Sequence, residues 1–199
     1  MEAGRRLLVE VQQPVLSRMG SLHARAVLSA LKACGVTHVV SLPDNSSAAL
    51  LTLLSSEDSL RLVRVTREGE AFAVASGLWI GGSVPAVVVQ NTGFLESGDA
   101  FRGTAQRMRI PLLCLIGYRG YARITRSAAQ LASGPGEADE FSRPDRDSAA
   151  LVTEPTLQAW RLPFDFLHSD ADVEKISAAF ARAQAESRPV ALLVTTDMK

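Results

Sequence analysis

The chain has 199 residues, which is within the ordinary size of one domain and long enough to bury a sizeable core. It carries 21 Lys and Arg residues against 21 Asp and Glu residues, so its formal net charge is zero. This balance gives no electrostatic reason to expect nucleic acid or an anionic membrane as a partner. No apolar run approaches the ~20 residues that span a bilayer, and the N-terminus does not resemble a secretory signal. We therefore expect a cytoplasmic protein.

Helical spacing and continuous apolar runs alternate along most of the chain. After an N-terminal arm at residues 1–19, we expect one domain over residues 20–199. The expected helices cover residues 22–34, 46–55, 69–80, 98–109 and 171–186, and the expected strands cover residues 36–42, 60–66, 84–90, 112–116, 163–167 and 190–195. Continuous apolar strands that alternate with helices predict a doubly wound α/β fold, in which helices cover both faces of a mostly parallel sheet.

One stretch of the chain departs from this rhythm. Between Tyr118 and Leu151 no period is sustained, and the residues at 133–136 and 143–147 favour turns. A connection of roughly thirty residues is far longer than the usual ~4–6. We therefore expect a flexible insertion at about 120–150, and the sequence leaves open whether it is a functional lid or only a mobile segment.

The two cysteines and three histidines do not form a metal site. Cys34 and Cys114 lie far apart within expected regular elements, and no Cys-x-x-Cys or Cys/His cluster occurs. We interpret them as core thiols, and we expect no metal ligands in this chain.

Glu68 is the leading catalytic candidate. It follows an expected strand and opens a helix of small residues that reaches Gly77, nine positions later. The carboxyl edge of a parallel sheet is where α/β folds bind ligands, and a helix N-terminus favours a carboxylate. Helix capping or simple solvation is the structural alternative, and Glu70 is the competing carboxylate.

Three further polar segments follow expected strands, and each has a structural alternative. Asp44, Asn45 and Ser46 are able to contact a substrate or to cap the next helix. The amide and hydroxyl groups of Gln90-Asn91-Thr92-Gly93 offer hydrogen-bond donors and acceptors to a ligand, but they also suit an ordinary turn. Arg119 is able to pair with an anion or to lie solvated at the surface.

These segments resemble motifs of thiamine diphosphate (TPP) enzymes. The Glu68 segment is similar to their cofactor-activating glutamate and the small-residue helix that follows it. Gln90-Asn91-Thr92-Gly93 resembles Gln-Asn-Ser-Gly of the sulfopyruvate and phosphonopyruvate decarboxylases. The segments that contain Asp44 and Arg119 resemble Val-Pro-Asp-Ser and Ile-Gly-Trp-Arg-Gly of the same enzymes, with Tyr118 in place of Trp. The chain is thus similar to a pyrimidine-binding domain.

The resemblance implies a role for each segment. Glu68 would drive the cofactor's aminopyrimidine into its reactive form, because the offset to Gly77 matches the family for Glu68 and not for Glu70. The cofactor-binding residues would be Glu68, Asn91, Thr92 and Gly93, and the substrate-binding residues would be Asp44, Asn45, Ser46, Gln90 and Arg119.

The resemblance also implies a partner chain. These enzymes hold the diphosphate and Mg²⁺ through a Gly-Asp-Gly motif, which this sequence lacks. We therefore expect a β-type subunit that carries them, a hetero-oligomer that shares TPP between the two chains, and decarboxylation of a small anionic 2-oxo acid. The alternatives are a carboligating, acyloin-forming synthase subunit and a non-catalytic regulatory subunit of the same fold.

Overall fold

A computed structural model describes residues 20–124 and 147–199 of the chain. Within these ranges, six strands form one sheet in the order β2-β1-β3-β4-β6-β5, and every neighbouring pair is parallel. The strands are β1 (His38–Ser41), β2 (Arg61–Arg64), β3 (Pro85–Gln90), β4 (Leu113–Gly117), β5 (Phe164–Leu167) and β6 (Val190–Val194). The doubly wound α/β fold predicted from the sequence is confirmed. The N-terminal arm and most of the expected insertion lie outside the described residues.

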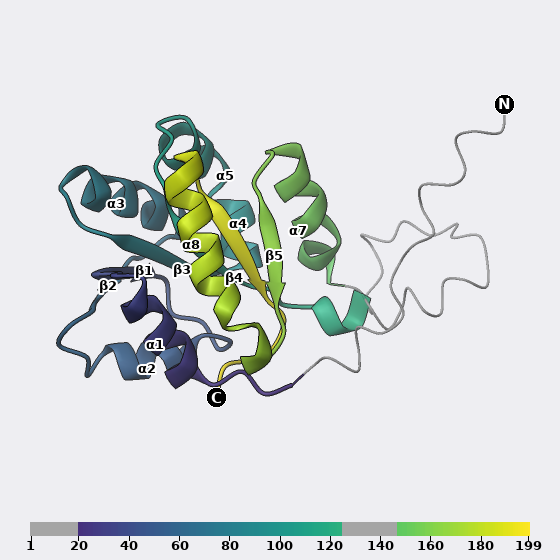
Figure 1. Cartoon of the computed structure of the whole chain (residues 1–199). Helices are drawn as coiled ribbons and strands as arrows, with labels where there is room; N and C mark the ends of the chain where they lie inside the picture. Colours follow the sequence, from purple (N-terminus) through teal and green to yellow (C-terminus); the bar gives the residue numbers. More distant parts are fainter. Residues whose placement is uncertain (1–19, 125–146) are drawn as a thin grey trace, which may run out of the picture.

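Each face of the sheet has its own hydrophobic core (Figure 1). One face is covered by α1 (Ala24–Ala33), α2 (Ala48–Leu54) and α8 (Glu174–Glu186), and the other by α3 (Glu68–Ile80), α4 (Asn91–Glu96), η2 (Phe101–Gln106) and α7 (Ser148–Ala159). Successive residues of a strand enter opposite cores, as Val88 does relative to Val87 and Val89. Because both of their faces are buried, the central strands β3, β4 and β6 appear in the sequence as continuous apolar runs.

Some segments differ from the elements expected from the sequence. Gln90-Asn91-Thr92-Gly93 forms no turn, because α4 begins at Asn91, directly after the last residue of β3. The expected helix at 98–109 is a short α5 (Gly98–Ala100) followed by the π-helical η2, and a 3-10 turn, η4 (Asp170–Asp172), precedes α8. Helix α7 was not predicted, because Pro155 lies inside it and proline ordinarily ends a helix.

The strand order creates a switch point between β1 and β3. From β1 the chain crosses outward to β2 and then returns to β3, on the other side of β1. The connections that leave the two strands at such a point diverge, and α/β proteins bind ligands in the crevice between them. The polar segments that follow β1, β2, β3 and β4 therefore all lie at one edge of the sheet.

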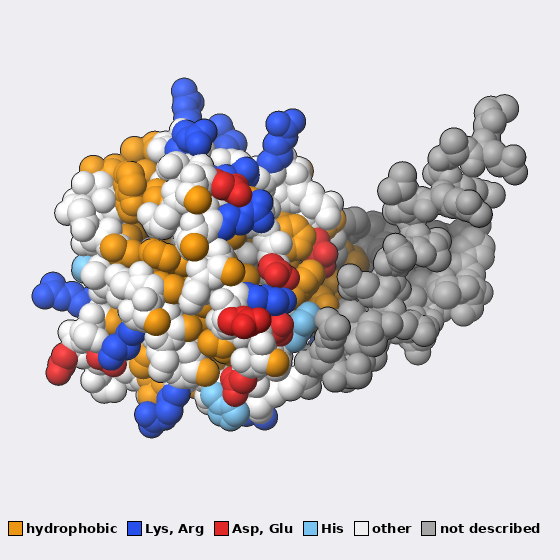
Figure 2. All heavy atoms as spheres, viewed as in Figure 1, with side chains coloured by type: hydrophobic (Ala, Val, Ile, Leu, Met, Phe, Trp, Pro, Cys, Tyr) orange, Lys and Arg blue, Asp and Glu red, His pale blue; other side chains and the backbone are white. Residues whose placement is uncertain are grey.

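Hydrophobic and charged side chains share the surface. Figure 2 shows acidic and basic groups interspersed on the viewed face, with hydrophobic groups between them. Among the described residues, the large hydrophobic side chains that are exposed are Trp79, Ile80 and Met108, and the first two end α3. No helix within the described ranges is both long and apolar enough to cross a membrane. Helix α3 thus has apolar groups on its outer side as well as on its buried side.

The packing of α3 predicts a large loss of stability for Phe72→Ala. Phe72 is fully buried, and its ring centroid lies 6.1 Å from that of Phe94 and 5.2 Å from that of Phe101. Truncation of a buried Phe leaves a cavity and costs about 3–5 kcal/mol, which urea unfolding of the chain would measure. The control is Trp79→Ala on the same helix, which should cost much less because Trp79 is exposed. Equal losses for the two variants would contradict this packing.

Candidate functional site

Glu68 is the first residue of α3, and its side chain lies against Gly93 of α4. A Cβ atom added to Gly93 would lie 2.2 Å from the Cγ of Glu68 and 2.5 Å from its Oε1. Only glycine at position 93 therefore leaves room for Glu68 in this position. The carboxylate is half-buried, and within the described part of the chain it makes no hydrogen bond and no ion pair. The structure thus joins two of the segments that the sequence singled out.

Glu70, the competing carboxylate, is engaged at the start of the helix. Its Oε2 accepts hydrogen bonds from the backbone N–H of Thr66 at 2.9 Å, the hydroxyl of Thr66 at 3.0 Å and the backbone N–H of Arg67 at 3.3 Å. The hydrogen bonds from Thr66 hold the pKa of Glu70 below its usual value, the backbone bond most strongly. Glu70 closes a capping box, which leaves Glu68 as the carboxylate that is open to a ligand.

Asn91 lies in the interior of the protein. Its Nδ2 donates hydrogen bonds to the carbonyl oxygen of Arg119 at 3.1 Å and to Oγ1 of Thr153 at 3.0 Å. The side chain is fully buried, so these bonds satisfy a group that would be costly to leave unpaired. Asn91 therefore ties α4 to the segment after β4 and to α7, and it does not face the edge of the sheet.

Gln90 and Thr92 are half-buried at the end of β3, on either side of Asn91. The hydroxyl of Thr92 donates to Oε1 of Gln90 at 2.9 Å. This bond fixes the orientation of the Gln90 amide, and its Nε2 has no hydrogen-bond partner among the described residues. Gln90 therefore offers a donor at the switch point.

Asp44 organises the turn between β1 and α2. Its Oδ1 accepts from the backbone N–H groups of Ser46 at 2.7 Å and Ser47 at 3.0 Å, and its Oδ2 accepts from the Ser47 hydroxyl at 2.8 Å. These bonds close the turn that precedes α2 and do not cap the helix itself, whose N-cap residue is Ser47. They orient Ser46 and the exposed Asn45. Ser46 in turn lies over Gly117, where an added Cβ would be 2.5 Å from the Ser46 Oγ.

Arg119 is paired with Asp147, the residue that caps α7. Its Nε donates to Oδ2 of Asp147 at 2.9 Å, and the side chain of Asp147 is 7% exposed whereas that of Arg119 is 59% exposed. Gly120 has a φ of 84° and packs on Asp147, whose Cβ would lie 2.6 Å from an added Cβ. The terminal nitrogens of Arg119 have no partner among the described residues, so they remain open to an anion.

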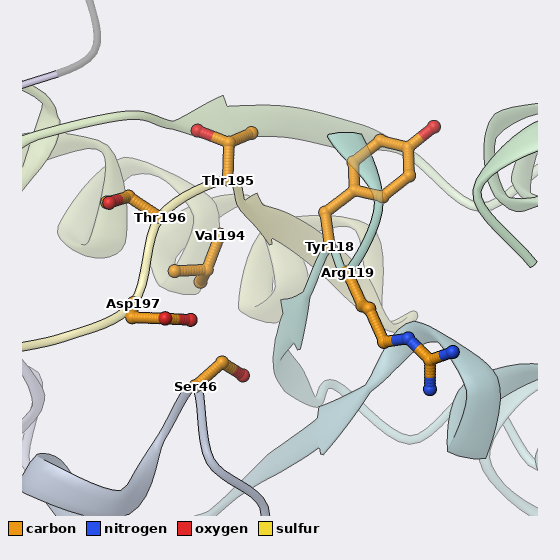
Figure 3. Close-up of a pocket in the computed structure, with 7 residues that line it drawn as sticks. All are labelled: Ser46, Tyr118, Arg119, Val194, Thr195, Thr196 and Asp197. Carbon is orange, nitrogen blue, oxygen red and sulfur yellow. The ribbon is translucent and has the colours of Figure 1, made fainter. Parts of the chain in front are cut away.

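A cavity of about 240 Å³ lies at the carboxyl ends of β4 and β6. Its lining is Ser46, Tyr118, Arg119, Val194, Thr195, Thr196 and Asp197. In Figure 3, the side chains of Ser46 and Asp197 point into the space between the labelled residues, whereas the guanidinium of Arg119 points away from them. Thr195, Thr196 and Asp197 were not predicted as site residues, although polar residues directly after a buried strand are the same signal that identified Gln90.

Tyr118 links the cavity wall to α7. Its hydroxyl lies 3.0 Å from the carbonyl oxygen of Ala150 and 3.0 Å from Oε1 of Glu154. Burial raises the pKa of Tyr118 above its usual range, and it also raises the pKa of Glu154. Figure 3 shows the Tyr118 ring directed away from Ser46 and Asp197, so its hydroxyl serves the contact with α7.

Comparison with known proteins identifies the family. Residues 23–137, more than half of the chain, match the family described as "Thiamine pyrophosphate enzyme, N-terminal TPP binding domain". The chain belongs to this family of TPP enzymes. The family resemblance inferred from Glu68 and the other edge segments is therefore confirmed.

Relatives of the TPP-enzyme chain include two kinds of decarboxylase. The phosphonopyruvate decarboxylase of Streptomyces viridochromogenes is 27% identical over 162 residues, which cover 81% of this chain and 36% of that protein. The sulfopyruvate decarboxylase subunit alpha of Methanococcus maripaludis is 31% identical over 111 residues, which cover 56% of this chain and 66% of that subunit. The chain thus spans about a third of the first relative and about two thirds of the second.

A solved structure agrees with the fold of this TPP-enzyme domain. Benzoylformate decarboxylase from Polynucleobacter necessarius superposes with a TM-score of 0.61 at 17% identity, over 88% of this chain and 30% of that chain. At this level of identity the likeness concerns the fold alone. In the described residues of the present chain, no group of three or more His, Cys, Asp or Glu side chains is placed to hold a metal ion.

The contact between Glu68 and Gly93 predicts a coupled pair of substitutions. Gly93→Ala should force Glu68 out of its present rotamer and cost about 0.5–1.5 kcal/mol, as measured by urea unfolding of the chain. In the Glu68→Ala background that cost should largely disappear, because the atoms that collide with the new Cβ are gone. The control is Gly77→Ala in α3, where an added Cβ meets nothing within 4 Å; it should stabilise the chain by about 0.5–1 kcal/mol. An equal cost of Gly93→Ala in both backgrounds would show that Gly93 is needed for another reason.

Proposed function

We propose that this chain is the α subunit of a two-component, TPP-dependent 2-oxo acid decarboxylase, in which Glu68 activates the cofactor. The observation that carries the proposal is that two carboxylates at the start of α3 differ in their hydrogen bonding. Glu70 accepts three hydrogen bonds from its own chain, whereas Glu68 rests on Gly93 without a partner in the described residues. An unpaired, half-buried carboxylate at a ligand-binding edge fits the ring nitrogen of an aminopyrimidine.

The proposed mechanism assigns one task to Glu68. The chemistry that TPP supplies when bound is the storage of electrons while a 2-oxo acid loses CO₂. Glu68 would hold the ring nitrogen of the aminopyrimidine through a hydrogen bond, so that the base for the reaction would come from the cofactor's own ring. Partial burial strengthens such a hydrogen bond because water competes less for it. Gly93 leaves room for the carboxylate. The Nε2 of Gln90, without a partner among the described residues, lies at the end of β3, directly before α4.

A β-type subunit is proposed to hold the diphosphate and Mg²⁺. The 199 residues contain no Gly-Asp-Gly segment, and the methanogen relative is named as a subunit alpha. Helix α3 supports a protein contact, because Trp79 and Ile80 are exposed and the small residues Ala73 and Gly77 lie on its outer side. We therefore propose a hetero-oligomer in which α3 and its bound cofactor face the partner chain.

The proposed substrate is a small anionic 2-oxo acid. The relatives are named for phosphonopyruvate and sulfopyruvate, each of which carries a second anionic group. Arg119 supports a contact with that second group, because its terminal nitrogens are open while Asp147 holds its Nε. Ser46, Asn45 and Gln90 are the proposed neutral contacts.

Substitution of the two glutamates tests the cofactor role. In the complex with its partner, Glu68→Gln should lower kcat by orders of magnitude, because an amide does not share a proton with the ring as a carboxylate does. TPP affinity should change little, since the diphosphate is held elsewhere. Glu70→Gln is the matched control: it weakens the capping box and lowers the thermal stability of the chain, but it should leave kcat nearly unchanged.

Two outcomes would contradict this assignment. If Glu70→Gln abolishes turnover while Glu68→Gln is tolerated, the wrong carboxylate has been chosen. If neither substitution affects turnover of an active complex, the chain does not activate the cofactor and the non-catalytic alternative applies.

Substitution of Arg119 tests the substrate class. Arg119→Ala should raise KM for sulfopyruvate or phosphonopyruvate by the equivalent of about 1.5–3 kcal/mol, the usual effect of losing a charge-assisted hydrogen bond. KM for pyruvate, which lacks the second anion, should change far less. The substitution also removes the ion-pair partner of the buried Asp147, so thermal unfolding of Arg119→Ala and of the unsubstituted chain is measured in parallel. Equal changes in KM for all three acids would remove Arg119 from substrate recognition.

A further inference from the structure

Helix α4 holds the start of α3 at a second point, three residues beyond Gly93. Oε1 of Glu96 lies 2.5 Å from Nη2 of Arg67, and Oε2 of Glu96 accepts a hydrogen bond from the backbone N–H of Gly69 at 3.2 Å. Arg67 and Gly69 are the residues on either side of Glu68. Residues three apart share one side of a helix, so the same side of α4 supports the Glu68 side chain and holds both of its neighbours.

The ion pair between Arg67 and Glu96 changes the pKa of both groups. The hydrogen bond that Arg67 donates to Glu96 is the main cause of the raised pKa of Arg67, and the same contact lowers the pKa of Glu96. Arg67 also lies within electrostatic range of Glu70 and Glu68. Glu70 already accepts three hydrogen bonds, whereas Glu68 accepts none among the described residues. If Arg67 lost its contact with Glu96, Glu68 would therefore be the nearby carboxylate that is open to pair with it.

The exposed ion pair between Glu96 and Arg67 contributes little to stability. The side chain of Glu96 is 38% exposed and that of Arg67 is 73% exposed, and ion pairs this exposed are weakened by water. The hydrogen bond from the N–H of Gly69, at the positive end of α3, is the part of the contact that stabilises the helix. The ion pair itself therefore has little explanation in stability.

We propose that Glu96 is a positioning residue for Glu68, which keeps the guanidinium of Arg67 away from the Glu68 carboxylate and anchors the first turn of α3 through Gly69. The inference rests on the proposed function of Glu68. It predicts that loss of the Glu96 charge changes the environment of the Glu68 carboxylate only while Arg67 is present.

Three variants isolate this effect. Glu96→Gln removes the charge and keeps the shape, and the double variant Arg67→Gln/Glu96→Gln removes the released cation as well. The control is Asp99→Asn, which breaks a neighbouring exposed ion pair between Asp99 and Arg102 at 2.5 Å without touching the residues next to Glu68. A purely structural role predicts equal effects for the single and double Glu96 variants, because both lose the same ion pair.

The first readout uses the chain alone. With ¹³C-labelled glutamate, NMR at neutral pH reports the side-chain carboxyl resonance of Glu68, which is assigned by its disappearance in Glu68→Gln. The resonance should shift in Glu96→Gln, return toward its original position in the double variant and stay unchanged in Asp99→Asn. A resonance that does not move in Glu96→Gln, or that moves equally in the double variant, would overturn the proposal.

The second readout uses the complex with its partner subunit and TPP. Exchange of the C2 proton of bound TPP into deuterated water should slow on the order of tenfold in Glu96→Gln and recover in the double variant, while the Kd for TPP is unchanged. Glu68→Gln is measured beside them. If Glu68→Gln leaves the exchange intact, the proposed function fails; if it abolishes exchange while the single and double Glu96 variants behave alike, only the positioning role of Glu96 fails.

Discussion

Close approach of side chains to backbone at the carboxyl edge of the sheet is the constraint on which the site depends. Glu68 lies where a side chain at position 93 would otherwise be, and Ser46 lies in the same relation to Gly117. In each pair the two residues lie on opposite sides of the switch point, at the ends of different strands. Each glycine therefore leaves room for a side chain that comes from the other side of the switch point. Packing against these glycines fixes the carboxylate of Glu68 and the hydroxyl of Ser46. Within the described residues, no hydrogen bond occupies the Glu68 carboxylate.

Three carboxylates gather where α3 begins, and their surroundings give them separate roles. Glu70 accepts the N–H groups that precede the helix, and Glu96 accepts the N–H of Gly69 together with the guanidinium of Arg67. Helix N-termini have N–H groups that lack intrahelical partners, so these two carboxylates satisfy the helix and balance its positive end. Glu68 is left with neither task, which is the state that its proposed cofactor-activating role requires.

Helix α7 supports the other side of the site. Its cap residue Asp147 holds Arg119, and its Thr153 accepts a hydrogen bond from Asn91. The carbonyl oxygen of Arg119 accepts from the same Asn91 amide, so one buried side chain connects α4, the segment after β4 and α7. Both the main chain and the side chain of Arg119 are therefore fixed by contacts outside its own segment.

The sequence by itself determined the fold class, the edge of the sheet that carries the site, and the family. Continuous apolar strands require a sheet buried on both faces, and polar residues directly after those strands have no place except its edge; the helix from Glu68 to Gly77 added the family signature. Only the tertiary structure decided which polar groups face that edge. Asn91 is buried by partners 28 and 62 positions away in the chain, and the contacts between Glu96 and the residues flanking Glu68 span 29 and 27 positions. Such pairings depend on strand order and helix packing, which local periodicity does not encode.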